Sequence, residues 1–411
     1  ALGMAKLASL FLLEGKAVML NRNDGDEFVY LSYARDILLT WTDPEPVFYF
    51  NIFLRHVVAL AQGLLGEGIQ SVIALNWLFL ALTAGIAYSL TGRILKDQAA
   101  AARVGLIAFL IVALNGNLIW WVEAGAKDAS LSGFLYIALA WAALEAVERR
   151  SLATYALCGL LLGLNCLTRG NALLLFGLLP PYLLFKLGWR EGTRASLVLA
   201  GCALLTISPA TIHNMLGGQF ALLASNSGVN IWLGNNPAAT GEYNVTGVPD
   251  AGGDYMRATW EFISTQTDAW LHVMWLKVRY MALSQMGGWT AAFLAACVLA
   301  ARRLSQSRAL VVYMVVAVPF ATCLIMFASK RYLFPVLPLM CCVMAPALDV
   351  LLGQFGWRLP LLRRWYPKPP PRPVKSAPVQ TAAEADDAGV SGDDGAANGD
   401  EPAKKDGSAA D

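Results

Sequence analysis

The sequence predicts an all-α membrane protein: a polytopic transmembrane helical bundle of about 9 to 11 spans, with outward-facing amphipathic helices and loops. Three observations support this fold class. First, 57% of the 411 residues are hydrophobic and only 15% are charged, unlike an ordinary soluble domain. Second, apolar runs of about 20 residues recur, and a helix of that length crosses a bilayer. Third, the connections between these runs alternate between basic and non-basic, as in multi-pass proteins.

Nine apolar runs are long enough to span a membrane, and together they define a transmembrane bundle at residues 70–353. They lie at 70–92, 104–120, 129–147, 152–168, 171–188, 195–212, 283–301, 309–328 and 333–353. Residues 1–20 are also apolar but carry Lys6, Glu14 and Lys16. We therefore expect them to form only part of a first transmembrane helix, truncated at its start.

The distribution of basic residues predicts which connections share a side of the membrane. Cytoplasmic connections are enriched in Lys and Arg. The basic connections contain Arg93, Lys96 and Arg103; Arg149 and Arg150; Lys186, Arg190 and Arg194; Arg302, Arg303 and Arg308; and Arg358, Arg363 and Arg364. The remaining connections, expected to face outward, are 21–69, 119–128, the turn near Arg169, 213–282 and 330–332.

The outer loop at 21–69 and the C-terminal segment have compositions of their own. Residues 45–65 are apolar but interrupted by Arg55 and His56, which favours an amphipathic helix lying in the membrane interface. With residues 27–40 it would form a cap on the outer rim. Residues 354–411 become rich in Pro, Ala, Gly and Asp, which predicts a disordered cytoplasmic tail.

Several kinds of chemistry find no support in the sequence. The seven cysteines have no metal-ligand spacing, and most fall inside apolar runs, where they fit small buried side chains. The three histidines are far apart, and nothing resembles a metalloprotease helix or a Ser-His-Asp order. A phosphate-binding P-loop is missing, which argues against a nucleotide-sugar donor bound in that way. We expect no nucleic-acid partner.

An acidic stretch precedes the first helix-like run of the outer loop. Asp24, Asp26 and Glu27 stand within four residues. Asp26 could simply cap the helix, with Glu27 favoured in the first turn by the helix dipole. Alternatively, one carboxylate could be a general base, because sugar transfer to a hydroxyl or amine requires removal of its proton. Asp24 and Asp26 could also bind a divalent metal ion, although this spacing is common.

Three stretches together resemble a known family. They are DEFVYLSYARDIL at 26–38, NSGVNIWLGNNPAATGEY at 226–243 and KRYLFPVLP at 330–338. Their sequence and order are similar to the GT-C membrane glycosyltransferases, and most similar to the protein O-mannosyltransferase and lipid A aminoarabinose transferase branch. The resemblance runs from about residue 24 to residue 350, with looser matches at 167–175 and 208–218.

This resemblance implies an inverting enzyme that takes a sugar from a polyprenyl phosphate, with Asp26 as the catalytic base. Glu27 and Tyr30, from the same motif, are expected to bind substrate, although Glu27 could also merely support the helix. The chain departs from the family at Glu45-Pro46-Val47, where a basic residue and two prolines are usual, and at His213, where an Arg is usual. Both departures leave the donor and acceptor open.

A phosphate leaving group needs cations more than a proton donor, so the outward-facing cations become candidates for substrate binding. They are Lys127, Arg169, Lys330 and Arg331, with Tyr332 following in the same motif. Lys330 and Arg331 could instead be interfacial anchors, and Arg169 could be paired with another helix. The resemblance also implies an acidic residue near the site in this connection, so Asp128 could orient the acceptor; alternatively, it could cap a helix.

The Asn-rich loop at 226–243 offers amide groups that suit sugar hydroxyls. Asn230, Asn235 and Asn236 are therefore predicted to bind substrate, with turn formation as the alternative.

The sequence thus predicts a multi-pass glycosyltransferase of the inner (plasma) membrane, with its active site facing the periplasm or exterior. Its expected partners are a polyprenyl-phosphate sugar, a lipid or glycan acceptor and membrane lipids. No cofactor is certain, and a divalent metal ion is an option. The main alternative is a transporter or flippase of a lipid-linked sugar, which would use the same cations but no base.

Overall fold

The computed structural model describes residues 26–50, 52–355 and 364–366, and all of their side chains except those of residues 26–28 and 285. The described residues form helices joined by loops, with two isolated β-bridges, Leu95 to Leu304 and Glu242 to Ala328. The predicted all-α fold is confirmed. The predicted partial span at 1–20 and the predicted tail beyond residue 366 lie outside the described residues.

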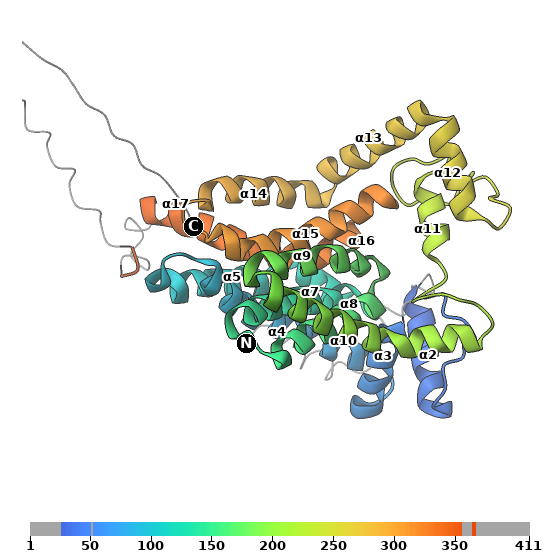
Figure 1. The fold of residues 1–411 in the computed structure, drawn as a ribbon, viewed down its shortest axis with the longest axis horizontal. Coiled ribbons are helices and arrows are strands. Elements are labelled where there is room, and N and C mark those ends of the chain that lie inside the picture. The colour runs from blue at the N-terminus through green and yellow to red at the C-terminus, as the bar shows by residue number, and fades with distance from the viewer. Residues whose placement is uncertain (1–25, 51, 356–363, 367–411) are drawn as a thin grey trace, which may run out of the picture. The chain divides into compact units, whose positions relative to one another are not determined.

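Every predicted span coincides with a helix or with a bent pair of helices (Figure 1). The bundle consists of α4 (Ile69–Ile94), η1 (Gln98–Ala100), α5 (Ala101–Ala113), α6 (Gly116–Glu123), α7 (Ala129–Arg149), α8 (Leu152–Thr168), η2 (Gly170–Leu174), α9 (Leu175–Leu187), α10 (Trp189–Leu216), α13 (Thr267–Leu283), α14 (Gln285–Ala300), α15 (Gln306–Ile325), α16 (Lys330–Leu333), η3 (Phe334–Val336) and α17 (Leu337–Phe355). By length and composition, six described helices could cross a membrane, or up to eight if each bent pair is one span.

The predicted span at 104–120 falls on the bent pair of α5 and α6, and the predicted span at 283–301 falls on α14, the second helix of another bent pair. α5 and α6 are bent by 45° and α13 and α14 by 81°. The predicted span at 152–168 is α8, whose 17 residues make it one of the shorter apolar helices. These findings support a multi-pass membrane protein.

Helix α7 lies at the centre of the bundle, because 78% of its apolar window is buried, the largest share among the candidate spans. Close packing elsewhere depends on small residues. A Cβ at Gly159 of α8 would lie 2.4 Å from the carbonyl oxygen of Leu199 on α10. A Cβ at Gly163, one turn later, would lie 2.5 Å from the Cβ of Thr206. This Gly-xxx-Gly spacing allows the close helix contact common in membrane bundles.

Two of the predicted cytoplasmic connections meet at one end of the bundle. The backbone N–H of Lys96 donates to the carbonyl of Arg303 at 2.9 Å, beside the Leu95 to Leu304 bridge. Nearby, the Nε of Arg103 lies 2.8 Å from the carboxylate of Asp349 on α17. The alternation of basic connections predicts this grouping.

The cap is formed by α2 (Asp26–Thr40) and α3 (Ile52–Leu65), which pack against each other. Figure 1 shows them at the same end of the bundle as α11 (Ser227–Gly234) and α12 (Tyr255–Thr265). The prediction of one interfacial helix over 45–65 is wrong at its start, because the helix begins only at Ile52. Arg55 is completely buried and does not form a polar outer face. Its partners, described below, explain why.

The cap is attached to the bundle through an apolar cluster. Tyr30 of α2 and Leu54 of α3 lie in it together with Ala126 and Leu131. Ala126 and Leu131 flank Asp128 at the start of α7. Burial of this shared apolar surface places the cap against the end of the bundle where Asp128 lies.

Candidate functional site

The site is organised around Asp128, which stands immediately before α7. The residue occupies the N-cap position of the helix, yet its side chain accepts no hydrogen bond from the helix backbone. Its carboxylate instead forms an ion pair with Arg169 at 2.9 Å and another with Arg331 at 3.3 Å. Of the two alternatives from the sequence, the capping role therefore does not describe this carboxylate.

Arg169 enters the site because α8 ends there. Its backbone is extended, with φ −147° and ψ 114°, so the chain leaves the helix and turns into η2. The side chain is only 4% exposed. It donates to Asp128 at 2.9 Å and to the carbonyl of Arg331 at 2.8 Å. Arg169 is thus paired across helices, as the alternative interpretation predicted, and it joins α7, α8 and α16.

The third part of the site comes from α16. The side chain of Ser329 caps this short helix by accepting from the backbone N–H of Arg331 at 3.3 Å. The Arg331 side chain remains 34% exposed, far more than that of Arg169. The ring of Tyr332 lies 5.8 Å from the Arg169 guanidinium, within range of a cation–π contact.

Two lysines complete the group of cations. The Nζ of Lys127 lies 5.9 Å from the centre of the Trp120 ring, and the Nζ of Lys330 lies 6.0 Å from the same ring. Lys127 also lies 5.7 Å from the ring of Trp121. The shared indole brings together two ammonium groups that are 203 residues apart, the same separation as between Asp128 and Arg331.

Two arginines keep the carboxylate of Asp128 ionised. Burial alone would raise the pKa of Asp128, but Arg169 and Arg331 lower the pKa below its usual value of 3.8, so the carboxylate stays ionised. Arg169 and Arg331 bind the carboxylate of Asp128, and Lys127 and Lys330 stand next to Asp128 and Arg331 in the sequence. We call these five residues the cation cluster. Its partly exposed members can form charge-assisted hydrogen bonds to a phosphate.

Comparisons with known proteins show what the chain is similar to. A family model described as dolichyl-phosphate-mannose-protein mannosyltransferase matches residues 51–213. Over 197 residues, 45% of this chain, the sequence is 32% identical to the undecaprenyl phosphate-alpha-4-amino-4-deoxy-L-arabinose arabinosyl transferase of two Pseudomonas aeruginosa strains. The chain resembles the GT-C glycosyltransferases.

The match extends over only part of those proteins. It covers 35% of the length of the Pseudomonas enzyme. ArnT from Cupriavidus metallidurans, solved bound to undecaprenyl phosphate, aligns with 87% of this chain and 61% of its own, at 14% identity and a TM-score of 0.51. That likeness shows a shared fold. The family match at 51–213 includes Lys127, Asp128 and Arg169, whereas α16 lies beyond it.

The first GT-C motif lies at the edge of the described residues. Helix α2 begins at Asp26, one residue before the start of the helix predicted over 27–40. The side chains of Asp26 and Glu27, and all of Asp24, lie outside the described part, so the predicted base and metal ligands stay predictions. Within the described residues, no group of three His, Cys, Asp or Glu side chains could hold a metal ion.

Of the remaining predicted substrate-binding residues, Tyr30, Asn235 and Asn236 are buried and Asn230 is half-buried. Tyr30 is 1% exposed in the cap cluster. Asn230 is half-buried on α11. The Asn236 amide donates to the carbonyls of Trp232 and Leu233, and its oxygen accepts from the N–H of Ala238. Asn236 therefore forms the turn that was the alternative for this loop.

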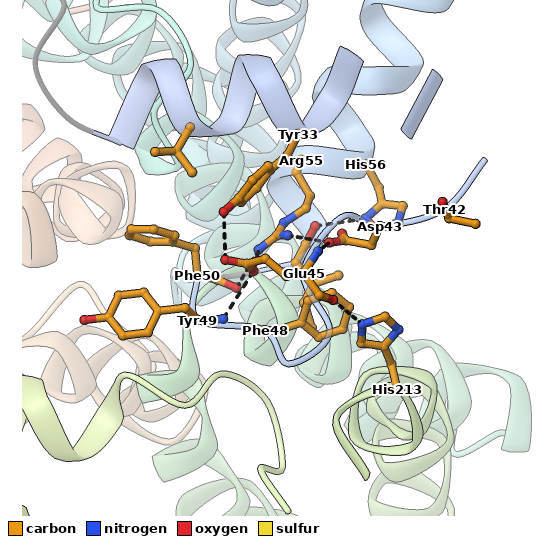
Figure 2. A network of polar contacts seen from close by, with 12 residues as sticks. Tyr33, Thr42, Asp43, Glu45, Phe48, Tyr49, Phe50, Arg55, His56 and His213 are labelled. Atoms are coloured by element: carbon orange, nitrogen blue, oxygen red, sulfur yellow. Dashed lines mark hydrogen bonds and ion pairs between the residues drawn. The ribbon is translucent and has the colours of Figure 1, made fainter. Parts of the chain in front are cut away.

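A second polar network was missed by the sequence analysis. Arg55 is buried and donates to Asp43 at 2.8 Å and to Glu45 at 2.7 Å, and the Tyr33 hydroxyl donates to Glu45 at 2.9 Å (Figure 2). Burial and this hydrogen bond raise the pKa of Tyr33. Arg55 was read as an interfacial charge because no sequence pattern pairs it with acids ten and twelve residues earlier.

This network joins the two positions where the chain departs from the GT-C pattern. The His213 ring bonds the backbone carbonyl of Glu45 at 2.7 Å, and it stacks on Phe48 with ring centres 4.2 Å apart (Figure 2). The two departures are therefore in contact, at the junction between the cap and the end of α10. Both departures are visible in the sequence, but no sequence pattern indicates that they are in contact.

Proposed function

We propose that this chain is a GT-C-type glycosyltransferase that transfers a sugar from a polyprenyl-phosphate donor to a lipid, polysaccharide or protein acceptor. The reaction takes place on the outer face of the inner (plasma) membrane and inverts the anomeric centre. The observation that carries this proposal is the cation cluster, gathered at span ends beside the cap that begins with Asp26.

The cations divide into two roles according to their exposure. Arg169 is buried, and its guanidinium bonds Asp128 and the backbone of Arg331. Its role is to fix the relative positions of the helix ends that form the site. Arg331 is partly exposed, and Lys127 and Lys330 are half-buried. These three bind the donor phosphate, because a partly exposed cation can exchange water for phosphate oxygens at little cost.

Asp26 is the proposed base. Positions 26 and 30 share one helix face, since residues four apart on a helix are neighbours. Tyr30 is buried in the cluster that contains Ala126 and Leu131, on either side of Asp128. This contact supports a position for the start of α2 near the cation cluster. We keep Glu27 as support for the helix start.

The chemistry then needs one base and no separate acid. The Asp26 carboxylate accepts the proton of the acceptor hydroxyl or amine, and the freed electron pair attacks the anomeric carbon. The bond between that carbon and the phosphate oxygen breaks, and its electron pair stays on the phosphate. Lys127, Lys330 and Arg331 stabilise the added negative charge as it develops.

The relatives support the donor class. The Pseudomonas enzyme is named for an undecaprenyl-phosphate sugar, and the Cupriavidus structure was solved bound to undecaprenyl phosphate. Because the chain spans only part of either protein, the sugar and the acceptor are left at the level of chemical class.

A transfer assay tests this function. Purified protein in detergent receives a radiolabelled polyprenyl-phosphate sugar and an extract of membrane lipids and glycans. We expect a new labelled glycoside with wild type and none with Asp26→Asn, which keeps the size of the side chain but cannot accept the proton. Asp36→Asn on the same helix is the control and should keep activity. A wild-type protein that moves the labelled lipid across proteoliposomes without forming a glycoside would be a carrier, and the proposal would be wrong.

A further inference from the structure

Lys277 of α13 is a buried lysine with no role in the reaction proposed above. It is 0% exposed. Its ammonium donates to the carbonyl of Leu324 at 2.7 Å and to the side-chain oxygen of Asn235 at 3.0 Å, and it lies 3.8 Å from the sulfur of Met274. All three acceptors are neutral. Burial of a charged group costs free energy, and its hydrogen bonds offset part of that cost. An apolar side chain at this position could not bond these three acceptors.

The bonds of Lys277 and Asn235 converge on the end of α15. The Asn235 amide donates to the carbonyl of Ile325 at 2.7 Å and to that of Ile231 at 2.8 Å. Leu324 and Ile325 are the last two residues of α15. The last carbonyls of a helix have no partner within it, and a cation there is favoured by the helix dipole. Lys277 and Asn235 thus supply the missing partners.

The segment that follows α15 is held by the same outer loop. The backbone N–H of Ala328 donates to the carbonyl of Gly241 at 2.8 Å. Gly234 lies so close to Met326 that a Cβ on it would come within 1.8 Å of the Met326 carbonyl oxygen. Successive points from Leu324 to Ala328 are therefore fixed against α13 and the 231–241 loop.

This segment leads directly into the cation cluster. Ser329 caps α16, and Lys330 and Arg331 are its first two residues. On the other side, Arg169 bonds the carbonyl of Arg331. The position of α16 is thus set by the bonds of Arg169 and Asp128 to Arg331 and by the fixed segment 324–328 that precedes the helix.

We propose that Lys277 and Asn235 are positioning residues for the donor-phosphate site: they fix the end of α15 and thereby place Lys330 and Arg331. This inference rests on the proposed function and assigns these two residues no contact with substrate. It also gives Asn235, which the sequence places among the substrate-binding residues, an indirect role, since its amide and its oxygen are already engaged with Ile231, Ile325, Trp270 and Lys277.

The kinetic test uses Lys277→Met and Asn235→Ala in the full chain. We expect the donor KM to rise about tenfold or more, because small displacements of binding groups have large effects. The acceptor KM should stay unchanged and kcat should change less than about threefold. Arg103→Met is the control: it removes another helix-bridging cation, bonded to Asp349 at the opposite end of the bundle, and should leave the donor KM unchanged.

A combined variant separates positioning from general weakening. If Lys277 acts through Lys330 and Arg331, then Lys277→Met added to the pair Lys330→Met and Arg331→Ala should raise the donor KM little beyond that pair alone. Multiplication of the effect of Lys277→Met and the effect of the pair would overturn the proposal, because it would mean that Lys277 acts independently.

Hydrogen exchange tests, without relying on turnover, whether Lys277 and Asn235 fix the end of α15. Amides in 326–332 should exchange faster in Lys277→Met and Asn235→Ala than in wild type, and at the wild-type rate in Arg103→Met. Unchanged exchange in the first two variants would overturn the inference even if wild type transfers sugar. A wild type that transfers no sugar refutes the proposed function, and the link to the donor is then judged by binding of undecaprenyl phosphate, which both variants should weaken about tenfold.

Discussion

The carboxylate of Asp128 lies 2.9 Å from the Nε of Arg169, although 41 residues separate them in the sequence. Both side chains are nearly inaccessible, at 3% and 4% exposure. This pair connects the start of α7, the most buried of the candidate spans in the described residues, to the break between α8 and η2. Because Arg331 bonds the same carboxylate, one acidic residue determines how three helix ends meet.

Asp128→Asn should destabilise the protein by about 3 kcal/mol, since it leaves the buried Arg169 without its counter-charge. The pKa of Asp128 is lowered by folding, so this stabilisation is fully present above the ordinary value of 3.8 and is lost as the pH falls through the folded value. The difference in melting temperature between wild type and variant should be constant from about pH 7 to 5 and shrink below about pH 4. A difference that grows with acid would contradict the assignment.

Arg331→Ala should raise the donor KM about 10- to 100-fold, because a hydrogen bond between charged groups contributes about 1.5–3 kcal/mol. The acceptor KM should not change. Arg257→Ala is the matched control, since Arg257 is an exposed arginine on α12. Initial rates at varied donor concentration provide the measurement. Equal effects of both variants would show that general surface charge, and not the cation cluster, attracts the donor.

Arg55→Met should cost about 3–5 kcal/mol, because it leaves Asp43 and Glu45 without a cation, at side-chain exposures of 5% and 13%. Thermal unfolding in detergent measures the loss. Arg35→Met, at an exposed position of α2, should change stability by less than about 0.5 kcal/mol. If the two variants were equally stable, the buried network would not hold the cap.

Gly217→Ala should loosen the cap by a steric clash. A Cβ at Gly217 would lie 1.8 Å from the carbonyl oxygen of Pro46, so the segment around Glu45 must move. Gly201→Ala in α10 is the control, because that position is open and alanine favours a helix by about 1 kcal/mol over glycine. Limited proteolysis between residues 41 and 50 should be faster in Gly217→Ala only. Equal protection in both variants would exclude this contact as a restraint.

Much of the fold follows from the sequence because lipid imposes one simple rule: a spanning helix must be apolar over about 20 residues. The predicted spans all fall on helices for this reason. The start of α3 was misplaced, because apolar residues at 46–50 extend the pattern although the chain there forms a loop stabilised by Arg55. A hydropathy pattern cannot distinguish an apolar loop from an apolar helix.

The candidate site was predicted unevenly. Residue type and position at span ends identified Asp128, Arg169 and Arg331, and the structure joins them. Lys277 was overlooked because a lone lysine in an outer segment looks like an ordinary solvated charge. Asn235 was noticed for its motif, but its partners on α13 and α15 lie 42 and 90 residues away.

The sequence by itself determined the all-helical membrane fold and the identity of the cations, because these depend on composition and local spacing. Only the tertiary structure decided which charges are paired and which remain exposed. The physical reason is that ion pairing and burial depend on contacts between distant segments, such as Arg169 with Asp128 and Lys277 with Leu324. This difference in pairing and exposure distinguishes Arg169 and Asp128, which hold the helix ends together, from the residues proposed to bind the donor.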